Sequence, residues 1–133
     1  MSNVQVLSNA LLLTGTLAAG TNVARVSSMH QHTLYINYSP DTDSTNALEV
    51  RIDVSPDNGT TWHPWHGNYA DTSGVLTQSG AKVLTYTSDG VADQLQAPYV
   101  FSVTATQIRI RAVETNTPGD FGNYTATLFS KTA

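Results

Sequence analysis

Hydrophobic and polar residues alternate with a period of two in four segments of the chain. In the first segment Leu34, Ile36 and Tyr38 alternate with Tyr35 and Asn37. The same pattern recurs over residues 48–54, 108–112 and 124–128. Successive side chains of a β-strand point to opposite faces, so this period predicts strands with one face on a core and the other in water.

Turn sequences that contain Pro, Gly, Asp and Asn separate these segments, for example Asp57-Asn58-Gly59 and Thr117-Pro118-Gly119-Asp120. Together the two signals predict about eight or nine strands. An all-β, two-sheet β-sandwich of jelly-roll or immunoglobulin-like type is the expected fold. The predicted strands are Val4–Leu7, Val23–Ser27, Thr33–Tyr38, Leu48–Val54, Thr61–His66, Lys82–Thr87, Val100–Thr104, Gln107–Ala112 and Tyr124–Ser130.

The 133 residues suffice for a single domain with one core, so residues 1–133 are taken as one β-sandwich domain. The N-terminal region 1–20 is apolar and poorly patterned, and it allows two interpretations. It is either the first strand of the sandwich or an N-terminal arm, which would lie across a neighbouring copy as an added strand.

Charge and composition exclude several classes of function for this chain. Charged residues make up only 12% of the chain and the formal net charge is −4, which argues against a nucleic-acid partner. There is no cysteine, and no basic residue precedes Arg25, so neither a disulfide framework nor a signal peptide is predicted. No stretch is apolar enough to span a membrane. We therefore expect a protein made in the cytoplasm.

The segment Ser55–Trp62 matches the Asp-box pattern Ser-x-Asp-x-Gly-x-x-Trp. At this spacing Asp57 can accept backbone N–H groups within the turn, and Gly59 supplies a positive φ. Trp62 then begins the return strand and packs over the hairpin. In sialidase-like propellers the same octet is a structural corner, so a structural role is predicted here for Asp57, Gly59 and Trp62.

Two groups of residues partly match the pattern of a metal site, but neither is predicted to bind a metal. His30 and His32 would share a face of a strand, but no third ligand stands at a suitable distance, and His63 and His66 lie beside tryptophans. Asp41, Asp43 and Ser44 resemble part of a calcium loop, but the Gly and the distant Glu of that loop are missing.

Three aromatic residues lie close together in the sequence: Trp62, Trp65 and Tyr69. They are candidate glycan-stacking residues, but packing as core or interface anchors is the favoured interpretation. The sequence has no nucleophile elbow, phosphate loop or Cys–His pair, so neither an enzyme activity nor a cofactor is predicted.

The strand Leu48–Ser55 and the hairpin that follows it, Asp57–Trp62, resemble small virion proteins of tailed phages. The ending Ile108–Thr115, Pro118 and Phe121-Gly122 is similar to the same group. The resemblance covers most of the chain from Thr33 onward and implies no catalytic residues.

That resemblance implies a capsid decoration protein, which would contact the major capsid protein or other virion proteins as a homo-oligomer, for example a trimer. Its location would be the virion. A tail or head-fibre component is the first alternative, and a carbohydrate-binding β-sandwich is the second.

Overall fold

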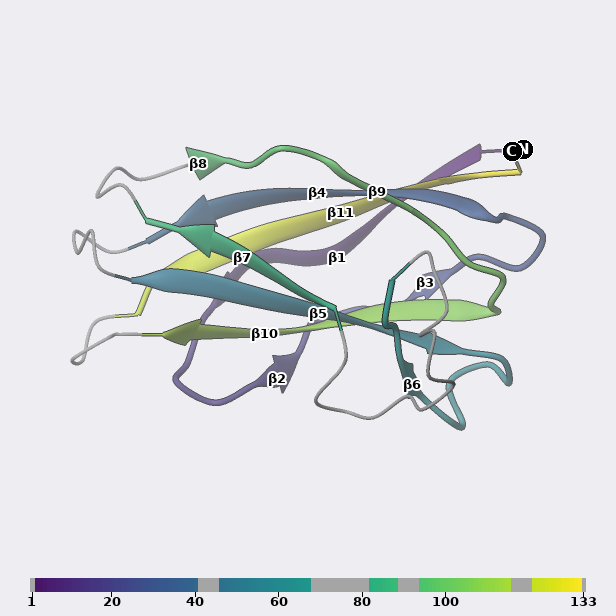
Figure 1. Cartoon of the computed structure of the whole chain (residues 1–133), viewed down its shortest axis with the longest axis horizontal. Helices are drawn as coiled ribbons and strands as arrows, with labels where there is room; N and C mark the ends of the chain where they lie inside the picture. Colours follow the sequence, from purple (N-terminus) through teal and green to yellow (C-terminus); the bar gives the residue numbers. More distant parts are fainter. Residues whose placement is uncertain (1, 41–45, 68–81, 89–93, 116–120, 133) are drawn as a thin grey trace.

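The computed structural model describes residues 2–40, 46–67, 82–88, 94–115 and 121–132. It confirms the predicted two-sheet β-sandwich (Figure 1). Sheet A contains β1 (Ser2–Leu12), β11 (Asn123–Lys131), β4 (Gln31–Ser39), β8 (Gln94–Leu95) and β9 (Tyr99–Ser102). Sheet B contains β2 (Ala18–Ala19), β3 (Ala24–Arg25), β10 (Gln107–Thr115), β5 (Ala47–Ser55), β6 (His63–Pro64) and β7 (Val83–Thr87).

The strand pairing distinguishes between the two predicted sandwich types. The first strand pairs with the last, β1 with β11, and β2 and β3 pair with β10. Moving inward along the chain, β4 pairs with β8 and β9, and β5 pairs with β6 and β7. A long antiparallel ribbon rolled into two sheets gives this nesting, which is the jelly-roll arrangement.

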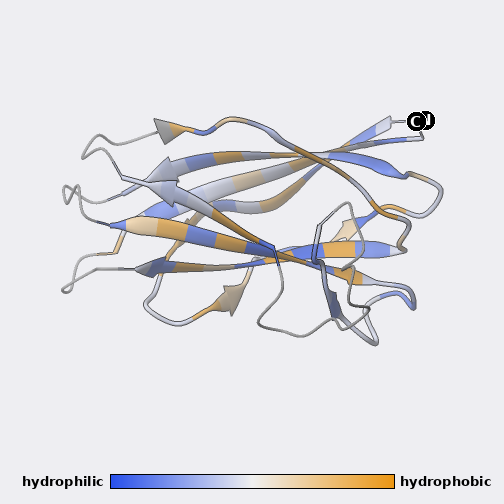
Figure 2. Ribbon diagram, in the orientation of Figure 1, coloured by the Kyte–Doolittle hydropathy of each residue, from blue (hydrophilic) through white to orange (hydrophobic). Residues whose placement is uncertain are grey.

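Alternation along the central strands builds the core. In β5 and β10 the inward residues are apolar and opposed in register, as in the pairs Ile52–Ile110 and Val50–Ala112. Figure 2 shows hydrophobic and hydrophilic residues alternating along both strands. The core is completed from sheet A by residues such as Leu34 and Leu128, which are fully buried.

Within this chain the N-terminal segment forms a strand of the sandwich, which is the first of the two interpretations given above. Ser2–Leu12 pairs with β11 along its length, from Ser2 opposite Lys131 to Leu12 opposite Asn123. Two register shifts interrupt the ladder, and Ala10 there has a positive φ of 47°. These irregularities explain why the segment lacks a clean period of two. The two chain ends lie together at one corner of sheet A (Figure 1).

Candidate functional site

The outer face of sheet A differs from an ordinary solvent-facing sheet. Among the described residues, seven large hydrophobic side chains are exposed, and six of them lie on this face; Val23 is the seventh. The six are Val4, Val6, Leu12, Tyr35, Leu95 and Val100. Monomeric proteins rarely gather exposed apolar residues on one side, so this concentration marks a candidate interaction surface.

The strand register assembles this surface from distant parts of the chain. One row crosses the whole sheet through Val4, Phe129, Thr33 and Val100, which stand opposite one another on β1, β11, β4 and β9. The next row contains Val6, Thr127 and Tyr35. Directly opposed side chains of this type pack against each other across the sheet.

Charge is nearly absent from the same face. Its remaining outward positions on β4, β9 and β11 carry Gln31, Asn37, Ser39, Ser102, Asn123 and Thr125. Within the described part of the sheet, the one charged residue at an outward position is Lys131, at the end of β11. An approaching protein would therefore displace water from apolar and weakly polar groups, without stripping the hydration of an ion.

A hollow of about 380 Å³ lies in this face beside Tyr35. Its lining includes Asn37, Leu95, Thr125 and Thr127 as well as Tyr35 itself. The side-chain oxygen Oδ1 of Asn37 is buried and has no hydrogen-bond partner among the described residues. Buried acceptors are nearly always satisfied in folded proteins, by protein groups or by ordered water.

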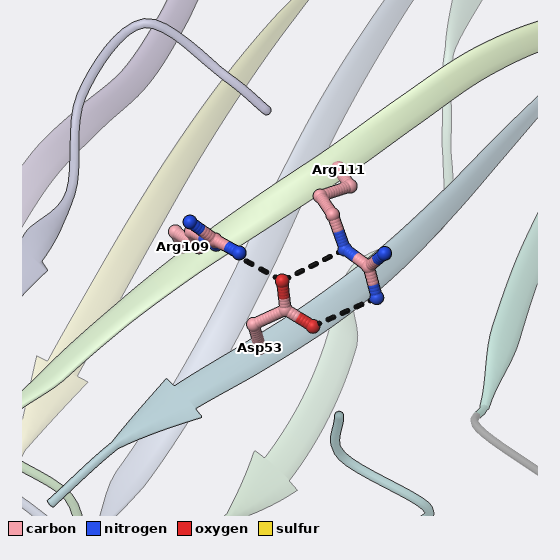
Figure 3. Close-up of polar contacts among 3 residues, drawn as sticks. All are labelled: Asp53, Arg109 and Arg111. Atoms are coloured by element: carbon pink, nitrogen blue, oxygen red, sulfur yellow. Dashed lines mark hydrogen bonds and ion pairs between the residues drawn. The ribbon is translucent and has the colours of Figure 1, made fainter. Parts of the chain in front are cut away.

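The outer face of sheet B has the opposite character. Glu49, Arg51 and Asp53 on β5 point outward, as do Arg109 and Arg111 on β10. Asp53 is the centre of this group, and its side chain is only 3% exposed. Figure 3 shows its carboxylate between the two arginines of β10, with Arg109 Nε at 3.0 Å and Arg111 Nε at 2.8 Å. The arginine side chains remain about a quarter exposed and keep this face hydrated.

The predicted Asp-box hairpin forms a hydrogen-bonded turn after β5. Asp57 Oδ1 accepts a bond from the Thr61 backbone N–H at 2.8 Å, and Ser55 Oγ accepts one from Gly59 N–H at 2.8 Å. These contacts, led by the bonds from Thr61, hold the pKa of Asp57 below its ordinary value. Trp62 stacks under Arg109, whose guanidinium carbon lies 4.5 Å from the ring centroid. The turn thus joins the charged network of sheet B.

Replacing Gly59 with alanine is expected to destabilise the fold by about 1–3 kcal/mol, because Gly59 has a φ of +88°. The new Cβ would also lie 2.7 Å from Gln107 Oε1. Urea unfolding of Gly59→Ala would measure the loss. Gly67→Ala separates the two causes, since Gly67 also has a positive φ but no atom lies within 4 Å of its added Cβ, so it should lose only the part that the backbone conformation costs. A Gly59→Ala protein as stable as wild type would refute this role.

Trp62 and Trp65 do not form the candidate glycan-stacking platform. Trp65 is 6% exposed and packs in the core against Tyr99 and Phe101, with ring centroids 5.7 and 5.1 Å away. Trp62 lies outside the core against Arg109, so the two rings do not share an exposed surface. Tyr69 lies outside the described residues. Side chains point alternately to opposite faces along the extended segment that contains β6, so the two tryptophans lie on different faces. Their short separation in the sequence did not reveal this.

The histidines likewise do not form a shared site. His32 is buried, and its ring nitrogens lie 2.8 Å from Ser130 Oγ and 3.1 Å from the Val103 carbonyl oxygen, whereas His30 is exposed before β4 begins. Burial lowers the pKa of His32. Within the described ranges no group of three or more His, Cys, Asp or Glu residues could hold a metal. The loop with Asp41, Asp43 and Ser44 lies outside those ranges.

Within the described ranges no helix is long and apolar enough to cross a membrane.

The outer face of sheet A was missed from the sequence, although a signal was present. In segments 31–39 and 123–131 the outward positions carry Thr, Tyr, Asn and Phe, whereas in 47–55 and 107–115 they carry Glu, Arg and Asp. An alternating strand whose polar side lacks charge indicates a surface that is suited to contact with protein.

No protein-family model matches this chain, and no curated protein matches its sequence. The candidate site is therefore defined by geometry alone: a nearly uncharged outer face on sheet A with a hollow beside Tyr35.

Proposed function

We propose that this chain is a structural virion protein of a tailed bacteriophage, and specifically a capsid decoration protein. The observation that carries the proposal is the outer face of sheet A, where six exposed hydrophobic side chains share a nearly uncharged surface. Such a surface favours contact with protein. Jelly rolls are also frequent in viral capsid proteins, and this supports the proposal by analogy of fold.

In the proposed mechanism the protein acts by adhesion. A sandwich with two fully hydrogen-bonded ladders, β4–β11 and β5–β10, is a stiff block whose faces keep their shape on contact. Burial of apolar area stabilises each contact by about 25 cal/mol per Å² before the costs of association. Repetition over a lattice then adds stability through multivalency, even when each contact is weak.

Co-sedimentation with undecorated heads of candidate tailed phages tests this function. We expect the protein to pellet with heads, to saturate at a fixed number of copies per shell, and to raise the temperature at which the heads disrupt. Free protein without heads is the control for aggregation. Failure to co-sediment, together with unchanged head stability, would refute the decoration role.

A carbohydrate-binding module is the second candidate function, and one observation favours it. The hollow beside Tyr35 combines a 47% exposed aromatic ring with amide and hydroxyl side chains, a combination that suits a neutral sugar. Jelly rolls also include lectin domains. Glycan-array binding that disappears in Tyr35→Ala would favour this candidate over decoration.

A further inference from the structure

We propose that Arg51 and Arg111, on the outer face of sheet B, together bind a carboxylate group that belongs to an aspartate or glutamate of a partner protein. The two arginines stand directly opposite each other on β5 and β10. This contact lies on the face of the sandwich opposite to the apolar surface of sheet A. It goes beyond the proposed function, because it assigns a second binding site with a different chemistry.

Arginine is concentrated on the outer face of sheet B. The chain has six lysine and arginine residues, and three of them, Arg51, Arg109 and Arg111, occupy outward positions on β5 and β10. On these two strands, which the structure describes in full, the acidic residues at outward positions are Glu49 and Asp53. The face therefore has one positive charge in excess, on a chain whose net charge is −4. A single negative charge from outside would balance it.

Asp53 serves two of the three arginines and leaves the third without an anion. Its Oδ2 accepts a hydrogen bond from Arg109 Nε, and its Oδ1 accepts one from Arg111 Nη2, both at 3.0 Å. The other terminal nitrogen of Arg111 points away from Asp53 (Figure 3). The guanidinium of Arg51 forms no hydrogen bond or ion pair with any residue that the structure describes, and Glu49, two residues before it, does not pair with it either.

The guanidinium of Arg51 is also partly withdrawn from water. Its Nε is buried without a hydrogen-bond partner, whereas its terminal nitrogens remain accessible on a half-buried side chain. A charge in surroundings of lower dielectric attracts an anion more strongly than one in bulk water. Arg111 adds to this attraction, because like charges directly opposite each other in a sheet are unfavourable until an anion lies between them.

The environment of Asp53 shows which ligand chemistry fits. Its carboxylate lies between two guanidinium groups of this same face (Figure 3). Residues directly opposed in a sheet have Cβ atoms about 5 Å apart, so the long side chains of Arg51 and Arg111 can reach one carboxylate between them. The planar guanidinium group matches a carboxylate through two parallel hydrogen bonds. A second carboxylate would thus repeat the arrangement around Asp53.

A protein is favoured over a nucleic acid as the source of the anion. The net charge of −4 repels a polyanion at long range, and nucleic-acid binding needs several phosphate contacts. One acidic side chain supplies the single charge that this face lacks, and it reaches the arginines without bringing further negative charges with it.

NMR titration of the arginine Nε–H signals in the whole chain tests the inference. The probe is the capped peptide acetyl-Gly-Glu-Gly-amide, which carries one carboxylate, at constant ionic strength. We expect saturable shifts at Arg51 and Arg111 with a Kd on the order of 1–10 mM, and at least fivefold weaker binding in Arg51→Gln. Arg25→Gln is the matched control, because it removes an equal charge at an exposed position on β3 of the same sheet and should bind like the wild type.

The outcomes decide both the site and its ligand. Shifts confined to Arg51 and Arg111, weakened in Arg51→Gln but not in Arg25→Gln, support the inference. An absence of saturable shifts, or equal binding by Arg51→Gln and wild type, overturns it. Inorganic phosphate and acetate are titrated in parallel. Tighter binding of phosphate than of the peptide would overturn the carboxylate assignment, and binding of acetate without the peptide would overturn the protein partner. No phage head enters this experiment, so its result and that of the decoration test are independent.

Discussion

Glu114→Ala is expected to lose about 3–5 kcal/mol of unfolding free energy. Glu114 is 1% exposed at the end of β10, where its carboxylate joins the two sheets. It accepts a hydrogen bond from the Tyr38 hydroxyl of β4 through Oε2, and one from the Gly122 backbone N–H through Oε1 at 2.7 Å. Burial, together with this carboxylate, raises the pKa of Tyr38. The truncation leaves two buried donors without an acceptor and a cavity between the sheets.

Thermal and urea unfolding would measure this loss, which corresponds to a fall in melting temperature on the order of 10 °C or more. Glu114→Gln should lose less, because an amide oxygen still accepts one of the two bonds. Glu49→Ala is the matched control from the neighbouring strand, since Glu49 points outward and is half-buried. Equal stability of the Glu114→Ala and Glu49→Ala proteins would contradict the bridging role.

Gly122→Ala is expected to cost more than about 3 kcal/mol, or to prevent folding at 37 °C. The added Cβ would overlap the Ser39 carbonyl oxygen and lie 2.6 Å from Pro40 Cα. Both are backbone atoms at the end of β4, where Ser39 pairs with Asn123, so no side chain can rotate away to make room. Relief would require β4 and β11 to separate, which would also draw the Gly122 N–H away from Glu114.

Soluble yield and urea unfolding would test the prediction for Gly122. Gly15→Ala is the control, because its added Cβ would meet the Phe121 ring at an ordinary contact distance of 3.6 Å. That substitution should change stability by no more than about 0.5 kcal/mol. A Gly122→Ala protein that unfolds at the same urea concentration as Gly15→Ala would show that the close backbone approach is not a constraint.

Some features of the fold could not be predicted from the sequence, because no local pattern of residues encodes them. The two-residue strands β2 and β8 exist only through their pairing with β10 and β4, and neither was predicted. The predicted strand Gln107–Ala112 extends to Thr115, which places Glu114 on the inward side of β10. A glutamate at that position ends the apolar alternation in the sequence, so its burial became visible only when Tyr38 and Gly122 were found beside it.

The sequence by itself determined that this protein is a two-sheet sandwich, because alternation with a period of two is a property of each strand alone and needs no partner to be recognised. It also identified the Asp-box turn, whose hydrogen bonds link residues at most four positions apart. Only the tertiary structure decided that the sandwich is a jelly roll and that Val4, Tyr35, Val100 and Phe129 share one face. Those residues are far apart in the chain, and strand pairing alone brings them together, so the candidate surface is a product of topology.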